Sequence, residues 1–378
     1  MFPTFKKYVP IRVLAISDGE NTPSAEICLE LPLNYLSSQG KISYEIRGEF
    51  NLPEGDFWRW SDVVMILRGA TDRVADLALQ ASNAGKTVIY ITDDDIQGLL
   101  DDLPANDEIR RHYESINALE NIRKMVAISS RVLVYSDLVK DRFSKISRNV
   151  EIVSAAADFE RIKSLKYSAV IDKSDDELRI GYAASGARQD DLDLLGDALP
   201  SLLEKFPNLY LETIDHRIDH IAHHPRYRTF EKVDGLENFY KLLLSRDWDV
   251  GIAPLAESRF RRSKTNNKYR TYASAGIPGI YSNRVPYSNT VVNGKCGLLA
   301  GDGREEWQQC LERLLLDRHL SRRIAQNAAM DVESRYGLKN VASYYFDVFK
   351  GRPRHFLSLY IHRVSNVFLH RSRAKLTN

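Results

Sequence analysis

Short apolar runs alternate with amphipathic stretches along the first half of the chain. Each run is continuously hydrophobic and ends in a polar turn, which is the pattern of a buried strand. The predicted strands are residues 12–18, 62–68, 86–92 and 131–136. Apolar residues at helical spacing predict helices over 73–84 and 108–128. Buried strands separated by helices indicate a parallel sheet covered on both faces, with ligands bound at the carboxyl ends of its strands.

This rhythm stops at residues 154–177 and then begins again. The second set of predicted strands is 178–183, 209–214, 250–255 and 279–282, and the predicted helices are 191–205, 236–245, 267–275 and 305–316. We therefore predict an α/β fold with two doubly wound, Rossmann-like domains that face a central cleft. The predicted divisions are a first domain over 1–160, a linker over 161–177, a second domain over 178–350 and a C-terminal tail over 351–378. No segment recurs at a fixed period, which argues against a solenoid.

The composition fits two globular domains. The chain has 378 residues, and 43% of them are hydrophobic, which is enough for a packed core and argues against disorder. Three widely spaced cysteines are too few for a disulfide framework or a zinc site of cysteine pairs, so we expect a reducing compartment. No run of about 18 apolar residues is present, and the first residues lack the pattern of a signal peptide. These features predict a cytoplasmic protein.

The charge is nearly balanced overall but uneven along the chain. Lys and Arg number 53 against 51 Asp and Glu, which gives a net charge of +2. Two segments, 259–270 and the tail 351–378, each hold six basic residues and no acid. Such a local excess predicts anionic partners at these two places and not along the whole surface, and we expect no nucleic-acid partner.

The tail has apolar residues at helical spacing and a basic polar face. Such a helix can lie on an anionic membrane surface, which would place the protein on the inner face of the cytoplasmic membrane as a peripheral protein. It can equally pack back on the first domain or bind a partner protein. The sequence leaves these alternatives open.

The internal basic segment leads into a short predicted helix that begins near Asn266 or Asn267. Asparagine is a good N-cap, and the free backbone N–H groups at a helix start attract phosphate. Lys264 and Lys268 bracket that start. A helix dipole with two ammonium groups suits a pyrophosphate, so we predict that a nucleotide diphosphate binds here. The alternative is a solvated basic loop.

Several motifs in this region resemble those of a known family. The motifs are residues 248–255, Phe260, Lys264, 267–269, 272–273, 276–278 and 293–299. In this order they resemble the donor-binding region of GT-B glycosyltransferases, in particular the branch of glycosyltransferase family 4 seen in surface-polysaccharide and O-antigen biosynthesis. Residues 179–188 resemble the start of the family's second domain, and residues 88–95 resemble an acidic turn of its first domain. The resemblance spans residues 12–337.

The resemblance implies a GT-B fold and the transfer of a sugar from a nucleotide-sugar donor to a glycan or lipid-linked glycan acceptor. It also implies retention at the anomeric carbon, without a metal or another cofactor. The expected catalytic residues are Asp94, Asp95, Arg188 and Lys268. The expected substrate-binding residues are Tyr182, Ser185, Gly186, Glu257, Phe260, Lys264, Asn267, Tyr269 and Thr271.

Two roles are expected among these residues. Arg188, Lys264 and Lys268 would stabilise the negative charge that builds on the leaving diphosphate. The acidic turn at residues 93–95 would orient the acceptor hydroxyl. The alternative for this turn is a helix cap, because aspartate is also favoured just before a helix.

The chain departs from the family at positions that bear on activity. Relatives carry two glutamates eight residues apart, and those positions are Ser263 and Thr271 here. Glu257 is near in sequence and is a candidate to replace them, and Arg188 stands where relatives often have histidine. Two other functions therefore stay open: a non-catalytic partner that binds sugar nucleotides or glycans, and a non-hydrolysing sugar-nucleotide epimerase.

One group of histidines has a spacing that metal sites use. His216, His220 and His224 recur at every fourth residue, as zinc ligands do on a helix. Aspartates between them and Pro225 directly after them indicate a surface loop instead. We therefore expect no metal site.

Overall fold

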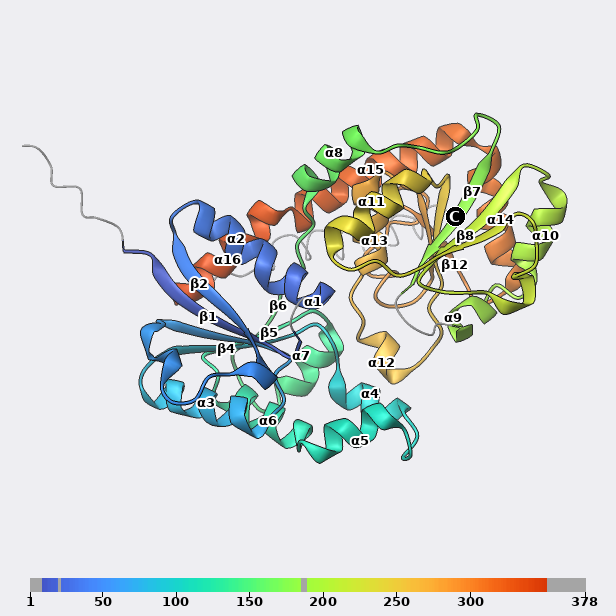
Figure 1. The fold of residues 1–378 in the computed structure, drawn as a ribbon. Coiled ribbons are helices and arrows are strands. Elements are labelled where there is room, and N and C mark those ends of the chain that lie inside the picture. Colours follow the sequence, from blue (N-terminus) through green and yellow to red (C-terminus); the bar gives the residue numbers. More distant parts are fainter. Residues whose placement is uncertain (1–8, 20–21, 185–188, 352–378) are drawn as a thin grey trace, which may run out of the picture.

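The structure is a computed structural model that describes residues 9–19, 22–184 and 189–351. It contains two six-stranded sheets, with strand orders β2-β1-β3-β4-β5-β6 and β12-β11-β10-β7-β8-β9. Figure 1 shows the two sheets in separate lobes, with helices around each. The predicted fold class, α/β with two doubly wound domains, is confirmed.

All neighbouring strands pair in parallel. The first sheet is formed by β1 (Ile11–Ser17), β2 (Ile42–Gly48), β3 (Val63–Leu67), β4 (Thr87–Thr92), β5 (Arg131–Val134) and β6 (Val150–Ile152). The second is formed by β7 (Leu178–Ala183), β8 (Leu209–Ile214), β9 (Tyr227–Phe230), β10 (Val250–Ala253), β11 (Gly279–Ser282) and β12 (Leu298–Ala300). The strand order reverses between β1 and β3 and again between β7 and β10, and such switch points are where open α/β sheets bind ligands.

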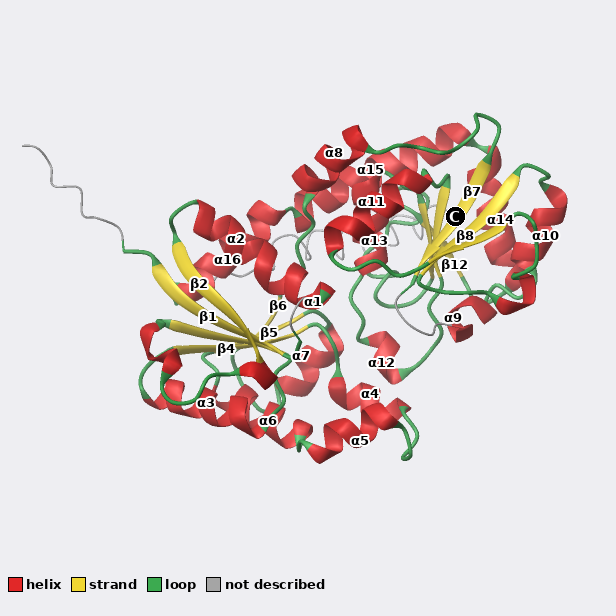
Figure 2. Ribbon diagram, viewed as in Figure 1, coloured by secondary structure: helices red, strands yellow, loops and turns green. Residues whose placement is uncertain are grey.

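Helices connect the strands in both halves. Those of the first half are α1 (Pro23–Ala25), the π-helix η1 (Glu26–Glu30), α2 (Leu31–Ser38), α3 (Asp72–Asn83), α4 (Ile96–Asp102), α5 (Glu108–Ser115), α6 (Ala118–Ile128) and α7 (Asp137–Phe143), with the short 3-10 helices η2 (Glu49–Asn51) and η3 (Phe57–Trp60). Those of the second half are α8 (Phe159–Ser168), α9 (Gln189–Asp193), α10 (Ala198–Lys205), the 3-10 helix η4 (Asp219–Ile221), α11 (Leu236–Arg246), α12 (Arg259–Arg262), α13 (Asn267–Ala275), α14 (Arg304–Leu316), α15 (Arg318–Tyr336) and α16 (Leu338–Phe349). Figure 2 shows helices on both faces of each sheet.

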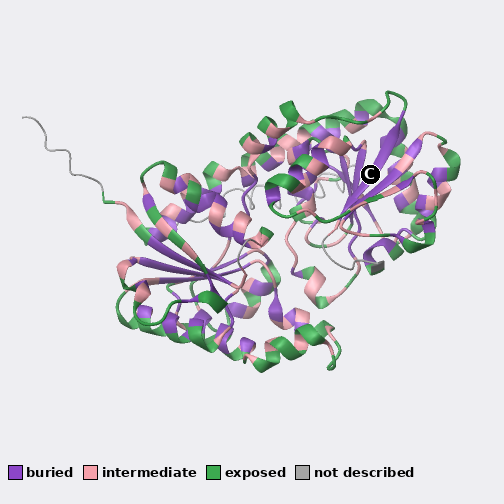
Figure 3. Cartoon of the chain, in the orientation of Figure 1, coloured by how far each residue is buried: buried purple, intermediate pink, exposed green. Residues whose placement is uncertain are grey.

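The strand side chains alternate between two cores in the first half. Leu14 and Ile16 of β1 pack with helices α3 and α6, whereas Val13 and Ala15 pack with α2 and α16. Because neighbouring strand residues point to opposite faces, both faces of the sheet must be covered, as the continuous apolar runs predict. Figure 3 shows the result: the central strands are buried, and the exposed residues lie mainly on helices and loops.

Two predicted helices are interrupted. The predicted helix over 108–128 is divided into α5 and α6 at Asn117, which has a φ of 52°. The predicted helix over 191–205 is divided into α9 and α10 near Gly196, which also has a φ of 52°. Asparagine and glycine enter the left-handed region most easily, and one residue in this conformation stops an α-helix.

The strands at or near the sheet edges lack the long apolar runs that identify the central strands. The outer strand β2 has half-exposed side chains between its buried ends, and β6 and β9 have only three and four residues. We did not predict these strands from the sequence, because a short or half-exposed edge strand has no continuous apolar run. Helices α15 and α16, which follow the last predicted helix, were not predicted either.

Two features differ from the predicted domain divisions. Half of the predicted linker over 161–177 is helix α8, whose Ile162 is buried in the second-half core. Helix α16 lies in the predicted second domain, yet it packs on the first sheet, where the hydroxyl of Tyr345 donates to the carbonyl of Cys28 at 3.0 Å. The chain therefore returns to the first domain after α15, and Figure 1 shows α16 beside α2.

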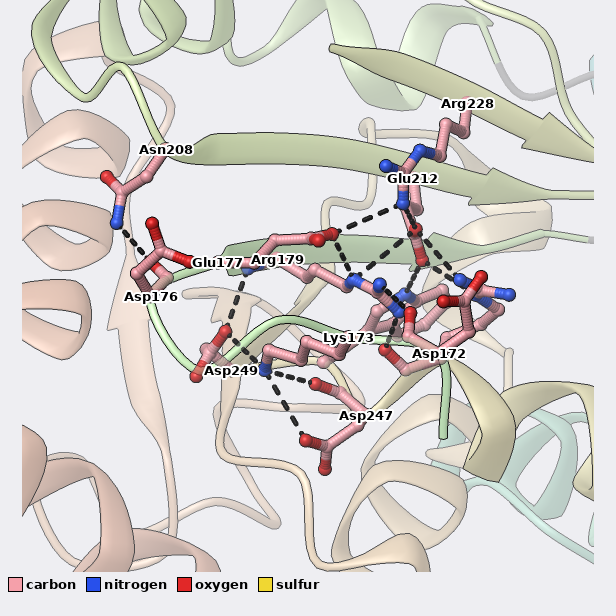
Figure 4. Close-up of polar contacts among 12 residues, drawn as sticks. Asp172, Lys173, Asp176, Glu177, Arg179, Asn208, Glu212, Arg228, Asp247 and Asp249 are labelled. Carbon is pink, nitrogen blue, oxygen red and sulfur yellow. Dashed lines mark hydrogen bonds and ion pairs between the residues drawn. The ribbon is translucent and has the colours of Figure 1, made fainter. Parts of the chain in front are cut away.

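A buried ionic network lies within the second sheet, and we call it the Glu212 network (Glu177, Arg179, Glu212, Arg228 and Arg246). The Glu212 side chain is fully buried, and its Oε2 accepts a hydrogen bond from Arg246 Nε at 3.1 Å. Arg179, which is 1% exposed, pairs with Glu177 at 2.6 Å. Figure 4 shows Glu177, Arg179, Glu212 and Arg228 facing one another near the amino end of β7.

Among residues 9–19, 22–184 and 189–351, no helix has the length and apolar character needed to cross a membrane. The same residues contain no group of three His, Cys, Asp or Glu side chains placed to hold a metal ion.

Candidate active site

Charged side chains meet at the carboxyl ends of β1, β3 and β4, beside the switch point of the first sheet. We call this group the Arg68 cluster (Asp18, Arg68, Asp93 and Asp94). Arg68 Nε lies 3.1 Å from Asp18 Oδ2 and 3.5 Å from Asp93 Oδ1. Arg68 Nη1 lies 3.2 Å from Asp94 Oδ2. Ser24 donates its hydroxyl to Asp93 Oδ2 at 2.6 Å, which fixes one carboxylate from the opposite side.

The Arg68 cluster is strained and highly charged. Arg68 has a φ of 54°, an uncommon conformation for a residue with a side chain, and such outliers gather at functional sites. Although burial opposes its charge, the carboxylates of Asp93, Asp18 and Asp94 raise the pKa of Arg68. Burial raises the pKa of Asp18 above its ordinary value, and Arg68 opposes only part of this shift. Three carboxylates around one guanidinium leave room for a second cation.

That second cation comes from the other domain. Lys264 Nζ lies 2.8 Å from Asp94 Oδ1, and it also sits 3.9 Å from the ring centroid of Phe260. Lys264 is in the loop between α12 and α13, the segment in which the sequence predicts phosphate binding. The ion pair therefore joins a residue expected to bind diphosphate to one expected to orient the acceptor.

Helix α12 reaches across to α4 beside this pair, as Figure 1 shows, and we call this the α4–α12 contact (Asp101, Asp102, Arg259 and Phe260). The backbone N–H of Phe260 donates to Asp102 Oδ2 at 2.8 Å, and that of Arg259 donates to Asp102 Oδ1 at 3.3 Å. Arg259 also pairs with Asp101 at 3.3 Å. The basic segment is thus attached to the first domain on both sides of Ser263.

On the second-domain side, Lys268 lies over the end of β7. Lys268 Nζ is 5.3 Å from the ring centroid of Tyr182, and that ring meets His216 edge to face at 5.9 Å. His216 Nε2 is buried without a hydrogen-bond partner among the described residues, and burial lowers the pKa of this imidazole. Asp215, just before it, has a φ of 58°. The carboxyl edge of the second sheet thus repeats the strained, polar character of the first.

Two predicted substrate-binding residues contact neighbouring helices. Tyr269 is fully buried, and its hydroxyl donates to Asp331 Oδ2 at 2.8 Å, so we assign it to the packing of α13 on α15. Thr271 hydrogen-bonds Tyr240 on the neighbouring helix α11. The helical period turns Tyr269, the residue after Lys268, to another side of α13, whereas Thr271, three residues after Lys268, lies on the same side and contacts Tyr240.

The other predicted positions on this segment have protein partners. Asn267 accepts a hydrogen bond from the buried Arg270 through its Oδ1. Glu257 pairs with Arg262 and, at 3.3 Å, with Arg284. These contacts hold the segment in shape around Lys264 and Lys268.

Asp95 differs from its neighbour Asp94. Its side chain is 3% exposed and lies 3.1 Å from Arg142, and burial raises its pKa. It therefore belongs to the interior of the first domain and not to the ion pair with Lys264. The remaining predicted residues, Ser185, Gly186 and Arg188, lie outside the described residues.

Sequence reasoning missed Asp18, Arg68 and Ser24, and it considered His216 only as a metal ligand. The sequence did hold a signal for two of them. Asp18 and Arg68 are the polar residues at the ends of two predicted strands, and these strands are neighbours in the sheet. Polar residues at the carboxyl ends of parallel strands are candidates for ligand binding even without a motif.

Comparison with solved structures finds the same architecture in known proteins. A glycosyltransferase from Rickettsia africae superposes with a TM-score of 0.64 at 14% identity, over 91% of this chain and 99% of that one. Sucrose-phosphate synthase from Thermosynechococcus elongatus gives 0.63 at 12% identity, over 90% and 98% of the two chains. HepE from Anabaena, solved with UDP and glucose, gives 0.60 at 13% identity, over 90% and 100%.

These comparisons establish a GT-B fold for this chain. Identities this low show the fold alone. A UDP-N-acetylglucosamine 2-epimerase shares it as well. The sequence matches no protein-family model, and no curated protein matches it.

Proposed function

We propose that this chain is a glycosyltransferase that moves a sugar from a nucleotide-sugar donor to an acceptor across the cleft between its domains. The observation that carries the proposal is the 2.8 Å contact between Lys264 Nζ and Asp94 Oδ1, which brings the predicted diphosphate-binding segment to the acidic turn of the first domain. On a GT-B fold, that is where donor and acceptor must meet.

The proposed chemistry follows from the charges. Negative charge builds on the diphosphate as the sugar leaves, and fixed cations aimed at that position lower the barrier. Lys264 and Lys268 supply two ammonium groups near the start of α13. Asp94 accepts a hydrogen bond from the acceptor hydroxyl and orients it. Lys264 links the two steps, because it can leave Asp94 for the more highly charged diphosphate.

UDP is the donor nucleotide that we propose. The support is that HepE, one of the similar structures, has been solved with UDP and with UDP-glucose. The ribose must be held differently from the family pattern, because Ser263 is 1% exposed and donates to the carbonyl of Phe260 at 2.7 Å, and Thr271 faces α11. We propose Glu257 for this grip, after release from Arg284.

The finer features of the proposal rest on the sequence resemblance. They are retention at the anomeric carbon, a glycan or lipid-linked glycan acceptor of surface-polysaccharide or O-antigen biosynthesis, and no metal requirement. The basic residues of the tail at 351–378 begin at Arg352 and lie outside the described residues, and we propose an anionic membrane surface as the partner of this tail.

A thermal-shift screen with UDP-, GDP-, dTDP- and CMP-sugars tests donor binding. A ligand at 100 times its Kd adds about 2.7 kcal/mol to the free energy of unfolding, so the cognate donor should give a clear shift. Lys268→Ala should remove both the shift and turnover. Lys339→Ala, which changes an exposed lysine of α16, should keep both. Full turnover by Lys268→Ala would exclude the phosphate assignment.

An epimerase is the second candidate, because an epimerase shares the fold and the two family glutamates are absent. Product analysis separates the two activities. A transferase releases UDP only when an acceptor is present, whereas an epimerase converts the UDP-sugar without any acceptor. A chain that binds the sugar nucleotide but does neither is the non-catalytic partner.

A further inference from the structure

Beneath the acidic turn, the first domain holds a cavity of about 70 Å³ that the proposed transfer does not use. Its lining comes from β4, α4, α6 and α7 and includes Tyr90, Asp95 and Arg142. Asp94 lines it too, so the cavity adjoins the residue that pairs with Lys264. All lining residues belong to the first domain.

Polar atoms beside this cavity lack partners. Tyr90 is fully buried, and its hydroxyl has no hydrogen-bond partner among the described residues. Arg142 Nη1 is likewise buried without one, although Nη2 of the same side chain lies 3.1 Å from Asp95 Oδ2. A buried polar group left in this way is costly, so such groups normally bind water or a ligand. Asp95 Oδ2 is also buried without a hydrogen bond among the described residues, so the missing partner offers an acceptor oxygen to Tyr90 and Arg142 and an N–H to Asp95.

The size of the cavity limits the ligand to a substituent. It has room for about two water molecules, and it is far smaller than the roughly 300–1,000 Å³ of a pocket that encloses a small molecule. A sugar ring therefore stays outside, and only a group attached to it can enter.

The lining also selects the chemistry of that group. Two aspartates, Asp94 and Asp95, and two arginines, Arg123 and Arg142, line the cavity, so its charges balance and favour a neutral group. A neutral group with one acceptor oxygen and one N–H satisfies Arg142 and Asp95 together. The apolar walls, which include Ile122 and Phe143, suit a methyl group. An acetamido group has all three features.

We propose that this cavity binds the acetamido substituent of an N-acetylated amino sugar in the acceptor. The carbonyl oxygen accepts from Arg142 Nη1 and the Tyr90 hydroxyl, the amide N–H donates to Asp95, and the methyl group contacts the apolar wall. The sugar hydroxyls then lie toward Asp94. This inference rests on the proposed function and adds the class of acceptor to it.

Ligand-observed NMR on the full chain tests the proposal with four probes: the methyl glycosides of N-acetylglucosamine and N-acetylgalactosamine, and those of glucose and galactose. At least one acetamido sugar should bind with a Kd about tenfold lower than its hydroxyl counterpart, since its amide adds hydrogen bonds to a buried charged pair. Saturation should be strongest at the acetamido methyl group.

Tyr90→Phe and Arg142→Met should remove this preference, the first partly and the second largely. Tyr90→Phe keeps the ring and its packing, so it remains informative if Arg142→Met fails to fold. Arg59→Met, at an exposed arginine of the same domain, is the control and should keep the preference. Equal affinity for both sugar types, binding by neither type, or an unchanged preference in Tyr90→Phe and Arg142→Met would each overturn the inference.

UDP binding is measured on the same samples. If UDP binds and the acetamido preference is absent, this inference fails alone and the cavity holds only water. If neither UDP nor any other nucleotide of the thermal-shift screen binds, the proposed function itself fails.

Discussion

Each domain holds a group of charged residues. The two groups are similar in composition but differ in which domain their partners come from. In the Glu212 network, three arginines surround two glutamates, all from one domain, and the central Glu212 and Arg179 are buried. In the Arg68 cluster, one arginine faces three aspartates, and the second cation, Lys264, comes from the other domain. The Arg68 and Asp94 side chains keep 14% and 20% exposure.

This difference indicates a structural role for the Glu212 network and a role in substrate binding for the Arg68 cluster. In a network closed within one domain, each charged group faces a partner from the same domain, so its role is to fix the strands that it joins. A cluster that takes one partner from the other domain can exchange that partner for substrate. Removing one member of a buried ion pair lowers the free energy of unfolding strongly, whereas a partly exposed pair contributes little to it.

The largest expected effect is the loss of stability on breaking the Glu212 network. Glu212→Gln leaves the buried guanidinium of Arg179 with less compensation, so the free energy of unfolding should fall by roughly 3–5 kcal/mol. Urea unfolding measures it. Glu237→Gln, which breaks an exposed pair with Lys241, is the control and should leave the midpoint unchanged. A change as small as the control would mean that the network is not structural.

The next effect concerns the Arg68 cluster and should appear in activity. Asp94→Asn removes the carboxylate that orients the acceptor, so turnover should fall about 100-fold or more, while urea unfolding stays near that of the wild type. Asp141→Asn, at an exposed residue of α7, should leave turnover unchanged. If Asp94→Asn proved strongly destabilising and fully active, the two groups would have exchanged roles.

A smaller effect is expected at the α4–α12 contact. The Arg259 side chain is 71% exposed, and its pair with Asp101 lies in solvent. Arg259→Ala should therefore lower the free energy of unfolding by less than about 1 kcal/mol. KM for the donor should change only a few-fold. A loss of activity comparable to that of Asp94→Asn would show that this contact, and not the Lys264 pair, organises the cleft.

The smallest effect is a pH dependence at Asp18. Burial raises the pKa of Asp18 in the folded state. The folded protein then binds this proton more tightly than the unfolded chain, so stability falls as the pH rises from the ordinary carboxyl range through the raised pKa. Asp18→Asn removes that penalty. Its unfolding midpoint should exceed that of the wild type at neutral pH and match it in acid; a lower midpoint at neutral pH contradicts the assignment.

Strands and helices in the middle of each sheet could be predicted, because their side chains are buried on a regular period. The strand over 86–92 and the helix over 73–84 are found as β4 and α3 within a residue or so. Edge strand β2 escaped because its exposed positions break the apolar run. The apolar residues of helix α16 recur at helical spacing, but no local pattern in the sequence indicates that this helix packs on the first sheet.

Residues of the candidate site could be predicted from the sequence where they belong to a recognisable motif. Lys264 and Asp94 were both proposed from the sequence, but their contact joins positions 170 residues apart and is set by the packing of two domains. Tyr269 shows the reverse case. It belongs to the motif, yet the helical period turns it toward Asp331 and away from the cleft. Arg68 lies in no motif, and only the sheet order brings it beside Asp18 and Asp94.

The central claim is that the cleft between the domains binds a nucleotide diphosphate through Lys264 and Lys268. A crystal structure of the chain with bound UDP tests it most directly. We predict that diphosphate oxygens lie within hydrogen-bond distance of both Nζ atoms and that Lys264 has left Asp94. UDP found instead at another surface, such as the 230 Å³ cavity beside Trp248 at the amino end of the second sheet, would contradict it.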